Sequence, residues 1–255
     1  MDSVLVRKDG PVWTVVLNRP ERKNAVDPET AEALRQVFDA FEADEEAKAA
    51  VLTGAGGTFC SGFDLTRVGD PAAAAALDPS GEGPMGPTRR ALTKPVIAAV
   101  EGHAVAGGLE LALWCDMRVA SRTAVFGVFC RRWGVPLIDG GTIRLPRLIG
   151  QGRALDMILT GRPVEAEEAL VWGLVDRLFP EGKALEKAQA LALEISQFPQ
   201  ACLRADRASA VSQWAFDMEA ALYLEAKGGL KPLQDEAAAG AQRFTEGAGR
   251  GGRFE

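Results

Sequence analysis

The sequence contains little histidine and cysteine, and it has no long apolar run. Its single histidine, His103, leaves little room for a Ser-His-Asp triad or a histidine-bound metal. The four cysteines lie far apart and form no CxxC pair, which argues against a zinc site and against a disulfide framework. No apolar stretch approaches the roughly 20 residues of a membrane-spanning helix. We therefore expect no metal site and no association with a membrane.

A surplus of basic residues is also absent. The net charge is −6, so the surface as a whole does not favour nucleic acid or an acidic membrane. An anionic ligand would need a local basic patch. The first residues lack the basic and apolar stretches of a secretory signal, and the unpaired cysteines suit a reducing compartment. These features predict a cytoplasmic protein.

The apolar residues, 47% of the chain, follow the pattern of an α/β protein. Short apolar strands alternate with helices, as in βαβ units with a parallel sheet. Asp27 followed by Pro28 is typical of a helix start. Strands are expected at 4–17 (a hairpin turning at 9–11), 49–53, 94–100, 117–120, 124–126 and 174–178. Helices are expected at 28–43, 109–115, 153–159, 165–172, 185–198, 202–224 and 232–244.

One segment does not follow this alternation. Residues 67–87 are rich in Ala, Gly, Pro and Asp, which predicts a mobile surface segment with one short helix.

The most informative motif is Gly107-Gly108-Leu109-Glu110, where a loop turns into an apolar helix. The first N–H groups of a helix have no internal acceptor and lie at the positive end of its dipole. Glycine allows a ligand to approach them closely. Glu110 lies on the same helix face, and burial among apolar residues would raise its pKa towards the range of a general acid or base. The alternative is a glutamate that faces solvent or an ion-pair partner.

A second motif, FCSGFDL at residues 59–65, places a Gly-containing turn after a strand. Together with residues 94–111 it resembles the signature of the enoyl-CoA hydratase/isomerase (crotonase) superfamily. Asn18-Arg19-Pro20 followed by Asn24-Ala25 also resembles that family, as do residues 159–162 and 166–175. The resemblance extends from about residue 6 to residue 244.

The resemblance implies a crotonase-like fold of the α/β class. Residues 1–195 would form a spiral of repeated ββα units that binds acyl-CoA. Residues 196–255 would form a helical region used in trimerisation, and such trimers often pair into hexamers. The implied substrate is a CoA thioester, and the implied chemistry uses no metal or redox cofactor.

The resemblance also implies roles for individual residues. The N–H groups of Phe63 and Gly107 would form an oxyanion hole for the thioester oxygen. The substrate-contacting residues would be Arg22, Lys23, Asn24 and Ala25 along the CoA, Ser61 and Asp64 in the second motif, Cys130, and Phe244 beside the adenine. For residues 22–25 a solvated turn is the alternative, and for Phe244 it is a packing role in the core or the trimer.

The sequence departs from the family pattern at one catalytic position. Hydratases of this family use two glutamates; Glu110 matches the first, but Cys130 occupies the second. A thiol is a poor substitute for a carboxylate in activating water. Asp139, in a loop that enters a helix, could replace it, although an aspartate there could also be a plain helix cap. Cys130 itself could be a small residue of the pocket wall or, less plausibly without a nearby histidine, a nucleophile.

Three functions are compatible with these residues. The favoured one is an enoyl-CoA hydratase-type enzyme in which Glu110 and Asp139 transfer protons. The second is an enoyl- or dienoyl-CoA isomerase or another reaction through an enolate. The third is an acyl-CoA-binding protein without catalysis, which the cysteine at position 130 would explain.

Overall fold

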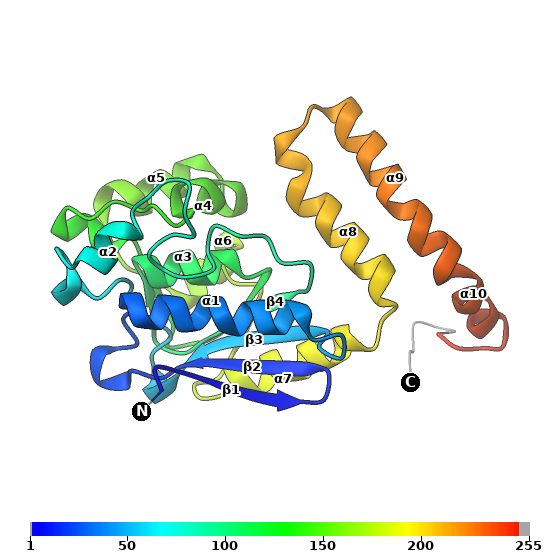
Figure 1. The fold of residues 1–255 in the computed structure, drawn as a ribbon, viewed down its shortest axis with the longest axis horizontal. Helices are drawn as coiled ribbons and strands as arrows, with labels where there is room; N and C mark the ends of the chain where they lie inside the picture. Colours follow the sequence, from blue (N-terminus) through cyan, green and yellow to red (C-terminus); the bar gives the residue numbers. More distant parts are fainter. Residues whose placement is uncertain (1, 250–255) are drawn as a thin grey trace. The chain divides into compact units, whose positions relative to one another are not determined.

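The computed structural model describes residues 2–249 of the 255-residue chain. The chain forms two compact units (Figure 1), of which the first ends at Ser196 and the second begins at Gln197. Every strand of the described residues belongs to the first unit.

A six-stranded sheet forms the centre of the first unit. Its order is β1-β2-β3-β4-β6-β9, and all neighbours are parallel except the β1–β2 hairpin. Gly10 in the hairpin turn has a φ of +57°, which glycine adopts without strain. The predicted hairpin and parallel sheet are confirmed. The strands are Val4–Asp9 (β1), Val12–Leu17 (β2), Ala49–Gly54 (β3), Val96–Val100 (β4), Met117–Ser121 (β6) and Arg177–Phe179 (β9).

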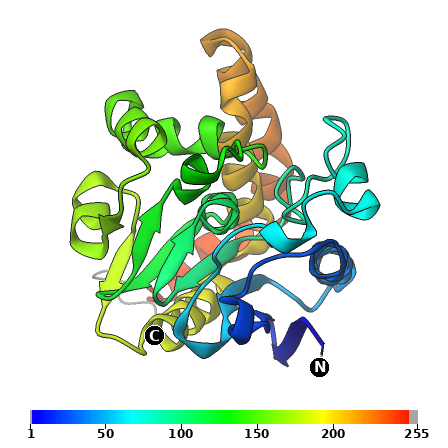
Figure 2. The ribbon, with the colours of Figure 1, turned by 90° about the vertical axis from the view of Figure 1, so that its left-hand side faces the viewer.

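Different helices cover the two faces of this sheet. Along β3, Ala50 and Leu52 join a core that includes side chains of α1 (Pro28–Ala43) and α3 (Gly107–Trp114). Ala49 and Val51 instead pack with α7 (Ala184–Ser196). Successive side chains of a strand point to opposite faces, so a strand covered on both sides must be apolar throughout. Figure 2 shows α1 nearly end-on, in blue, beside the strands.

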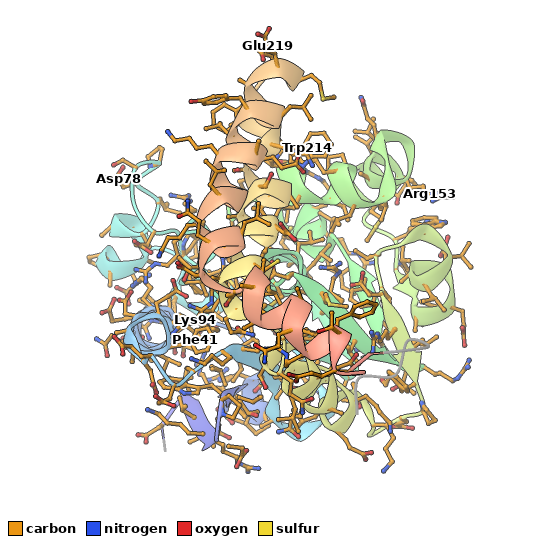
Figure 3. All side chains as sticks on the ribbon, turned by 90° about the vertical axis from the view of Figure 1, so that its right-hand side faces the viewer. Phe41, Asp78, Lys94, Arg153, Trp214 and Glu219 are labelled. Carbon is orange, nitrogen blue, oxygen red and sulfur yellow. The ribbon has the colours of Figure 1, made fainter. Side chains whose placement is uncertain are left out.

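Polar groups fix both ends of α1. Asp27 accepts a hydrogen bond from the Thr30 amide at 2.8 Å, which confirms the predicted N-cap. At the other end, the buried ammonium of Lys94 donates to the Phe41 carbonyl oxygen at 2.7 Å. The same ammonium lies 5.1 Å from the Phe41 ring, and Figure 3 labels both residues. These contacts tie α1 to the start of β4.

A smaller sheet leads into α3. It has the order β5-β7-β8, with β5 (His103–Val105) parallel to β7 (Val125–Gly127) and β7 antiparallel to β8 (Val164–Glu165). One residue separates β5 from the first residue of α3. The other helices of this unit are α2 (Pro71–Ala75), α4 (Gly141–Ile149), α5 (Gln151–Thr160) and α6 (Ala166–Trp172).

The segment predicted to be a mobile surface loop is partly buried. Residues 83–88 are buried, and α2 is its short helix. The guanidinium of Arg89 donates to the carbonyl oxygens of Asp78 at 2.6 Å and Ile138 at 3.1 Å. A description of the whole segment as surface loop is therefore wrong, because its C-terminal part packs into the unit.

The second unit contains a helical hairpin, α8 (Gln200–Ser212) and α9 (Met218–Asp235), followed by α10 (Ala237–Thr245) (Figure 1). The predicted single helix over 202–224 is wrong. Asp217 caps α9 by accepting a hydrogen bond from Ala220 N at 2.8 Å, and this new start interrupts the helix. Within residues 2–249, no helix combines the length and apolar character that a membrane crossing requires.

Candidate active site

The N-terminus of α3 is built from a strained residue and two glycines. Ala106 precedes the helix with φ +54° and ψ −126°, a conformation that costs a non-glycine residue free energy. Gly108 packs so closely on the Cys60 carbonyl that a Cβ atom would collide with it. Gly107 is the first residue of the helix, so its N–H has no acceptor within the helix.

The turn that contains Phe63 lies directly beside this helix start. Cys60 N donates to His103 O at 2.9 Å, and Val105 N donates to Cys60 O at 3.1 Å, which joins the turn to β5. Gly62 has a φ of +103°, and a Cβ atom on it would lie 2.9 Å from Gly107 N. Glycine is therefore required at position 62, where the turn lies against the start of α3.

Two backbone amides at this junction are left unpaired. Val26 N donates to Gly62 O and Asp64 N donates to Val26 O, both at 2.8 Å. These hydrogen bonds use the residues before and after Phe63, and the Phe63 amide takes no part in them. Among residues 2–249, neither Phe63 N nor Gly107 N has a hydrogen-bond acceptor. Gly107 is buried and Phe63 is half-buried. Backbone N–H groups withdrawn from solvent rarely lack an acceptor, so two of them at one place suit a ligand oxygen.

A cavity of about 420 Å³ opens at these residues. Phe63, Gly107, Glu110 and Asp139 all line it, and among residues 2–249 the only ionisable residues in its wall are the two acids. Most of the remaining wall is apolar and comes from residues 68–85 and 134–138, which include Leu77, Met85 and Ile138. The volume is in the range of small-molecule sites.

Glu110 is buried in this wall with 3% of its surface exposed. Its Oε1 accepts hydrogen bonds from Asp139 N and Gly141 N, both at 2.8 Å. Burial, and next the nearby Asp139 carboxylate, raise the pKa of Glu110 to about 7, although the two N–H donors oppose this. Both forms are then populated near neutral pH, as suits a general acid or base. Oε1 is thus held by the backbone, whereas Oε2 accepts no hydrogen bond from the described residues.

Asp139 is buried beside Glu110 and is tied to the segment that covers the cavity. Its Oδ1 accepts hydrogen bonds from the hydroxyl of Thr88 and, at 3.2 Å, from Met85 N. Burial raises the pKa of this carboxyl, and the Thr88 hydrogen bond acts against that rise. Within the described chain, neither Glu110 nor Asp139 forms an ion pair. Two buried, unpaired carboxyls therefore share one apolar cavity.

Comparison with known proteins places the chain in a family. The model of the enoyl-CoA hydratase/isomerase family matches residues 7–249. The chain belongs to the enoyl-CoA hydratase/isomerase family. Its sequence is 37% identical to enoyl-CoA hydratase EchA19 of Mycobacterium tuberculosis, over 96% of this chain and 94% of that protein. It is 38% identical to (E)-benzylidenesuccinyl-CoA hydratase of Thauera aromatica, over 77% of each.

The fold agrees with that assignment. The structure of enoyl-CoA hydratase EchA1 from Mycobacterium marinum superposes with a TM-score of 0.88, at 35% identity and over 96% of each chain. The crotonase-like fold implied by residues 59–65 and 94–111 is thereby confirmed. The chain is a lyase or isomerase of this crotonase superfamily.

Cys130 lies near this crotonase-family site but does not line the cavity. It is buried, and burial followed by the charge of Glu110 raises the pKa of its thiol. A thiol with a raised pKa stays protonated and is a weak nucleophile. The geometry thus places Asp139, and not Cys130, in the cavity wall with Glu110.

The loop predicted to contact CoA contains two different kinds of residue. Arg22 and Lys23 are exposed and form no ion pair within residues 2–249, so their charges are available to a phosphate. Asn24 and Ala25 are buried. The Asn24 amide donates to two backbone carbonyls, those of Ala55 at 2.8 Å and Thr58 at 2.6 Å. Its side chain therefore shapes the loop.

Three other predicted contact residues lie in separate settings. Asp64 pairs with Arg19 at 3.0 Å and caps a short helical turn through Thr66 N, so its carboxylate is already engaged. Ser61 is half-buried, and its hydroxyl lies 3.4 Å from Arg22 O. Phe244 belongs to α10 of the second unit and is 63% exposed.

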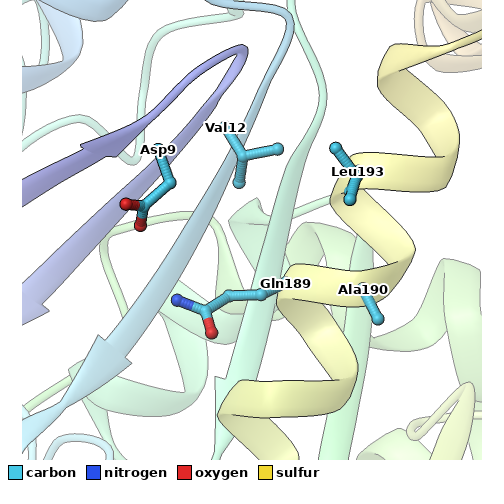
Figure 4. A pocket seen from close by; sticks show the side chains of 5 residues that line it. All are labelled: Asp9, Val12, Gln189, Ala190 and Leu193. Atoms are coloured by element: carbon cyan, nitrogen blue, oxygen red, sulfur yellow. The ribbon is translucent and has the colours of Figure 1, made fainter.

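A second cavity of the first unit lacks the paired acids of the candidate active site. It has a volume of about 220 Å³ and lies between the β1–β2 hairpin and α7 (Figure 4). Its wall contains Asp9, Val12, Gln189 and Leu193. Gln189 already donates to Thr14 Oγ1 at 2.9 Å. This second cavity therefore presents no group comparable to the paired acids of the candidate active site.

Proposed function

We propose that this family member binds a CoA thioester with its carbonyl oxygen between the amides of Phe63 and Gly107. The observation that carries the proposal is that both unpaired amides line the same cavity as Glu110. As the substrate becomes enolate-like, negative charge accumulates on that oxygen, and preorganised N–H donors stabilise it. One such donor contributes a factor of about 10²–10³ to turnover in comparable enzymes.

The two carboxyls supply the proton transfers. In hydration, one carboxylate removes a proton from water as the water oxygen bonds to C3. The electron pair of the double bond moves onto the thioester as an enolate, and a carboxyl proton is then delivered to C2. Glu110, through Oε2, and Asp139 divide these transfers. The balance involves only protons and water, so the proposal includes no metal and no redox cofactor.

Migration of a double bond is the second candidate. It stays open because the family resemblance places Cys130 where hydratases have their second glutamate, and a thiol is a poor substitute for that carboxylate in activating water. In that reaction one carboxyl removes a proton from the acyl chain and returns it at another carbon, and no water is added. The presence of Asp139 beside Glu110 in the cavity wall favours hydration, and it argues against a protein that only binds acyl-CoA.

The cavity wall also supports an inference about the acyl group. Apart from the two acids its lining residues are uncharged and mostly apolar, and the described part of the chain places no basic residue in this wall to pair with an anionic substituent. An additional carboxylate on the acyl chain would be desolvated beside two acids, at a cost of several kcal/mol. We therefore propose an uncharged, apolar acyl group. Arg22 and Lys23 would contact phosphates of the CoA.

The surface of the second unit supports a proposal about how copies of the chain assemble. The second unit exposes large apolar side chains, which include Trp214, Tyr223 and Leu233. Exposed apolar surface of this extent is typical of protein interfaces. We propose that it packs against further copies of the chain in a trimer or a dimer of trimers, in the cytoplasm.

A thioester panel in D₂O tests the reaction. The panel contains apolar 2-enoyl-CoA and 3-enoyl-CoA esters and matched esters that carry a terminal carboxylate or trimethylammonium group. Mass spectrometry should show water gained with one deuterium at C2 for the apolar 2-enoyl esters and little reaction of the charged ones. Deuterium incorporation without water would select isomerisation. No mass change across the panel would contradict the proposed function.

A further inference from the structure

The Asp139 carboxyl is held by a residue that does not touch the cavity. Thr88 is fully buried and is absent from the cavity wall, yet its hydroxyl donates to Asp139 Oδ1. The amide of Met85 reaches the same oxygen at 3.2 Å. Both donors therefore act on Oδ1, which leaves Oδ2 as the oxygen able to exchange a proton with a substrate in the cavity.

The backbone around this contact is held by a different side chain, that of Arg144. Arg144 donates through Nη2 to Thr88 O at 2.6 Å and through Nη1 to Asp139 O at 3.0 Å. Gly140 has a φ of +96°, and a Cβ atom on it would collide with this guanidinium. The Arg144 guanidinium thus joins the segment of Thr88 to the segment of Asp139 by bonding a backbone carbonyl of each, and we call this arrangement the clamp. The Thr88 hydroxyl can be removed without releasing the clamp.

We propose that Thr88 is a positioning residue that holds the Asp139 carboxyl through Oδ1 and sets the pH range in which Asp139 works. This inference rests on the proposed function, in which Asp139 is the second acid or base of the site. Thr88 lies outside the two sequence motifs at residues 59–65 and 94–111, and the proposed role depends on its hydroxyl alone. A valine of nearly the same shape would keep the packing and lose the hydrogen bond.

The direction of the effect follows from the charges around Asp139. Besides Thr88, the charged groups that face it are Glu110, Arg89 and Arg144. The hydroxyl donor stabilises the ionised carboxyl, whereas burial and the neighbouring acid disfavour it. Removing the donor must therefore raise the pKa of Asp139 further. A smaller fraction of the carboxyl is then ionised at a given pH within its titration range.

Thr88→Val and Thr88→Ser are the variants that test the proposal. The readout is kcat/KM for the best substrate of the panel between pH 5 and 9, with kcat and KM recorded separately. In Thr88→Val the acid limb of the profile should move to higher pH. On that acid limb activity should fall roughly ten- to a hundred-fold, which is the range for losing a hydrogen bond to a charged group, with little change in KM. Thr88→Ser keeps the hydroxyl and should restore the profile.

Thr30→Val is the matched control. Thr30 is equally buried and donates its hydroxyl to Asp27 at 2.6 Å, but it does not line the cavity. It should lose stability without any movement of the pH profile. A similar profile for Thr88→Val and the wild type, or no restoration by Thr88→Ser, would overturn the inference.

Asp139→Asn separates this outcome from failure of the proposed function. If Asp139→Asn keeps the wild-type rate and profile, Asp139 has no role in proton transfer, and the roles proposed for Asp139 and for Thr88 both fail while the reaction itself stands. If Asp139→Asn abolishes turnover while Thr88→Val keeps the wild-type profile, Asp139 stays in the mechanism and only the role of Thr88 is refuted.

Discussion

Two pairs of buried carboxyl groups lie in the first unit, and their surroundings are opposite. Asp27 and Asp64 both contact Nη2 of Arg19, at 2.9 and 3.0 Å. Glu110 and Asp139 have no ion-pair partner among the described residues. The first pair joins α1 to the turn that carries Phe63, and the second lines the cavity.

The difference appears when the pKa of Asp64 is compared with those of Glu110 and Asp139. Burial acts to raise the pKa of Asp64, but hydrogen bonds from Thr66 and Arg19 and the charge of Arg19 hold it below its ordinary value. For Glu110 and Asp139 burial prevails, and both pKa values are raised. Hydrogen bonds from Thr66, together with the contact to Arg19, thus keep Asp64 ionised, whereas burial keeps protons on Glu110 and Asp139.

The largest expected effect comes from Glu110→Gln. The amide oxygen can still accept the two backbone N–H groups, but it cannot transfer a proton. Turnover should fall by about 10²–10⁴ while acyl-CoA binding is retained. Initial rates and calorimetric titration measure the two quantities.

Glu101→Gln provides the matched control for that experiment. Glu101 also accepts two backbone amides, Gly182 N at 3.2 Å and Ala184 N at 3.0 Å, and it lies outside the cavity wall. It should keep nearly full activity. Equal rates for Glu110→Gln and Glu101→Gln would remove Glu110 from the mechanism.

Arg19→Met should give the next largest effect. It would leave Asp27 and Asp64 without an ion-pair partner, which is the situation of Glu110 and Asp139. Two buried carboxylates would lose their shared cation, so the free energy of unfolding at pH 7 should fall by about 3 kcal/mol. This value is at the low end for buried ion pairs because Arg19 is partly exposed. The pKa of Asp64 is lowered by folding, so its stabilisation is lost as pH falls through that value. Urea unfolding at pH 7 and pH 3.5 should therefore show a smaller deficit in acid, and an equal deficit would disprove the argument.

The pH dependence of stability should have the opposite sign for Glu110. Its pKa is raised from 4.5 to about 7 in the folded protein, so its contribution is intact below pH 4.5 and is lost as pH rises to 7. Ionising such a carboxyl costs about 3 kcal/mol. Glu110→Gln should therefore be up to that much more stable than the wild type at pH 8 and similar to it at pH 4.5. Thermal unfolding at both pH values measures this, and a pH-independent offset would contradict the assignment.

Ala106→Gly should give the smallest effect. Glycine adopts the φ of +54° without strain, and the relief should exceed the entropy that glycine adds to the unfolded chain. We expect a gain of about 0.5–1 kcal/mol in unfolding free energy. Ala104→Gly, in β5 where φ is ordinary, should lose stability instead. A loss in both variants would show that Ala106 is not strained.

Local patterns in the sequence predicted the parts of the site that depend on neighbouring residues. The helix start at Gly107-Gly108 and the burial of Glu110 one turn later follow from residues that are close in the chain. The cap at Asp27 and the extent of α1 are predictable for the same reason. The family resemblance paired this motif with residues 59–65, and the fold brings the two together through β5.

The remainder of the site depends on contacts between distant segments. Thr88 is 51 residues from Asp139, and no periodicity links them. Met85 lies in a segment whose composition predicted an exposed loop, because Gly and Pro indicate turns but not where a turn packs. The buried role of the Asn24 side chain was also missed, since an asparagine in a basic loop looks like a ligand contact until Ala55 and Thr58 are seen beside it.

The convergence of the two amides is tested most directly by a crystal structure of Glu110→Gln with a bound acyl-CoA thioester. The thioester oxygen should lie about 2.7–3.1 Å from both Phe63 N and Gly107 N, with the acyl chain in the apolar cavity. A thioester oxygen bound elsewhere, or either amide bonded to another protein group, would contradict the account.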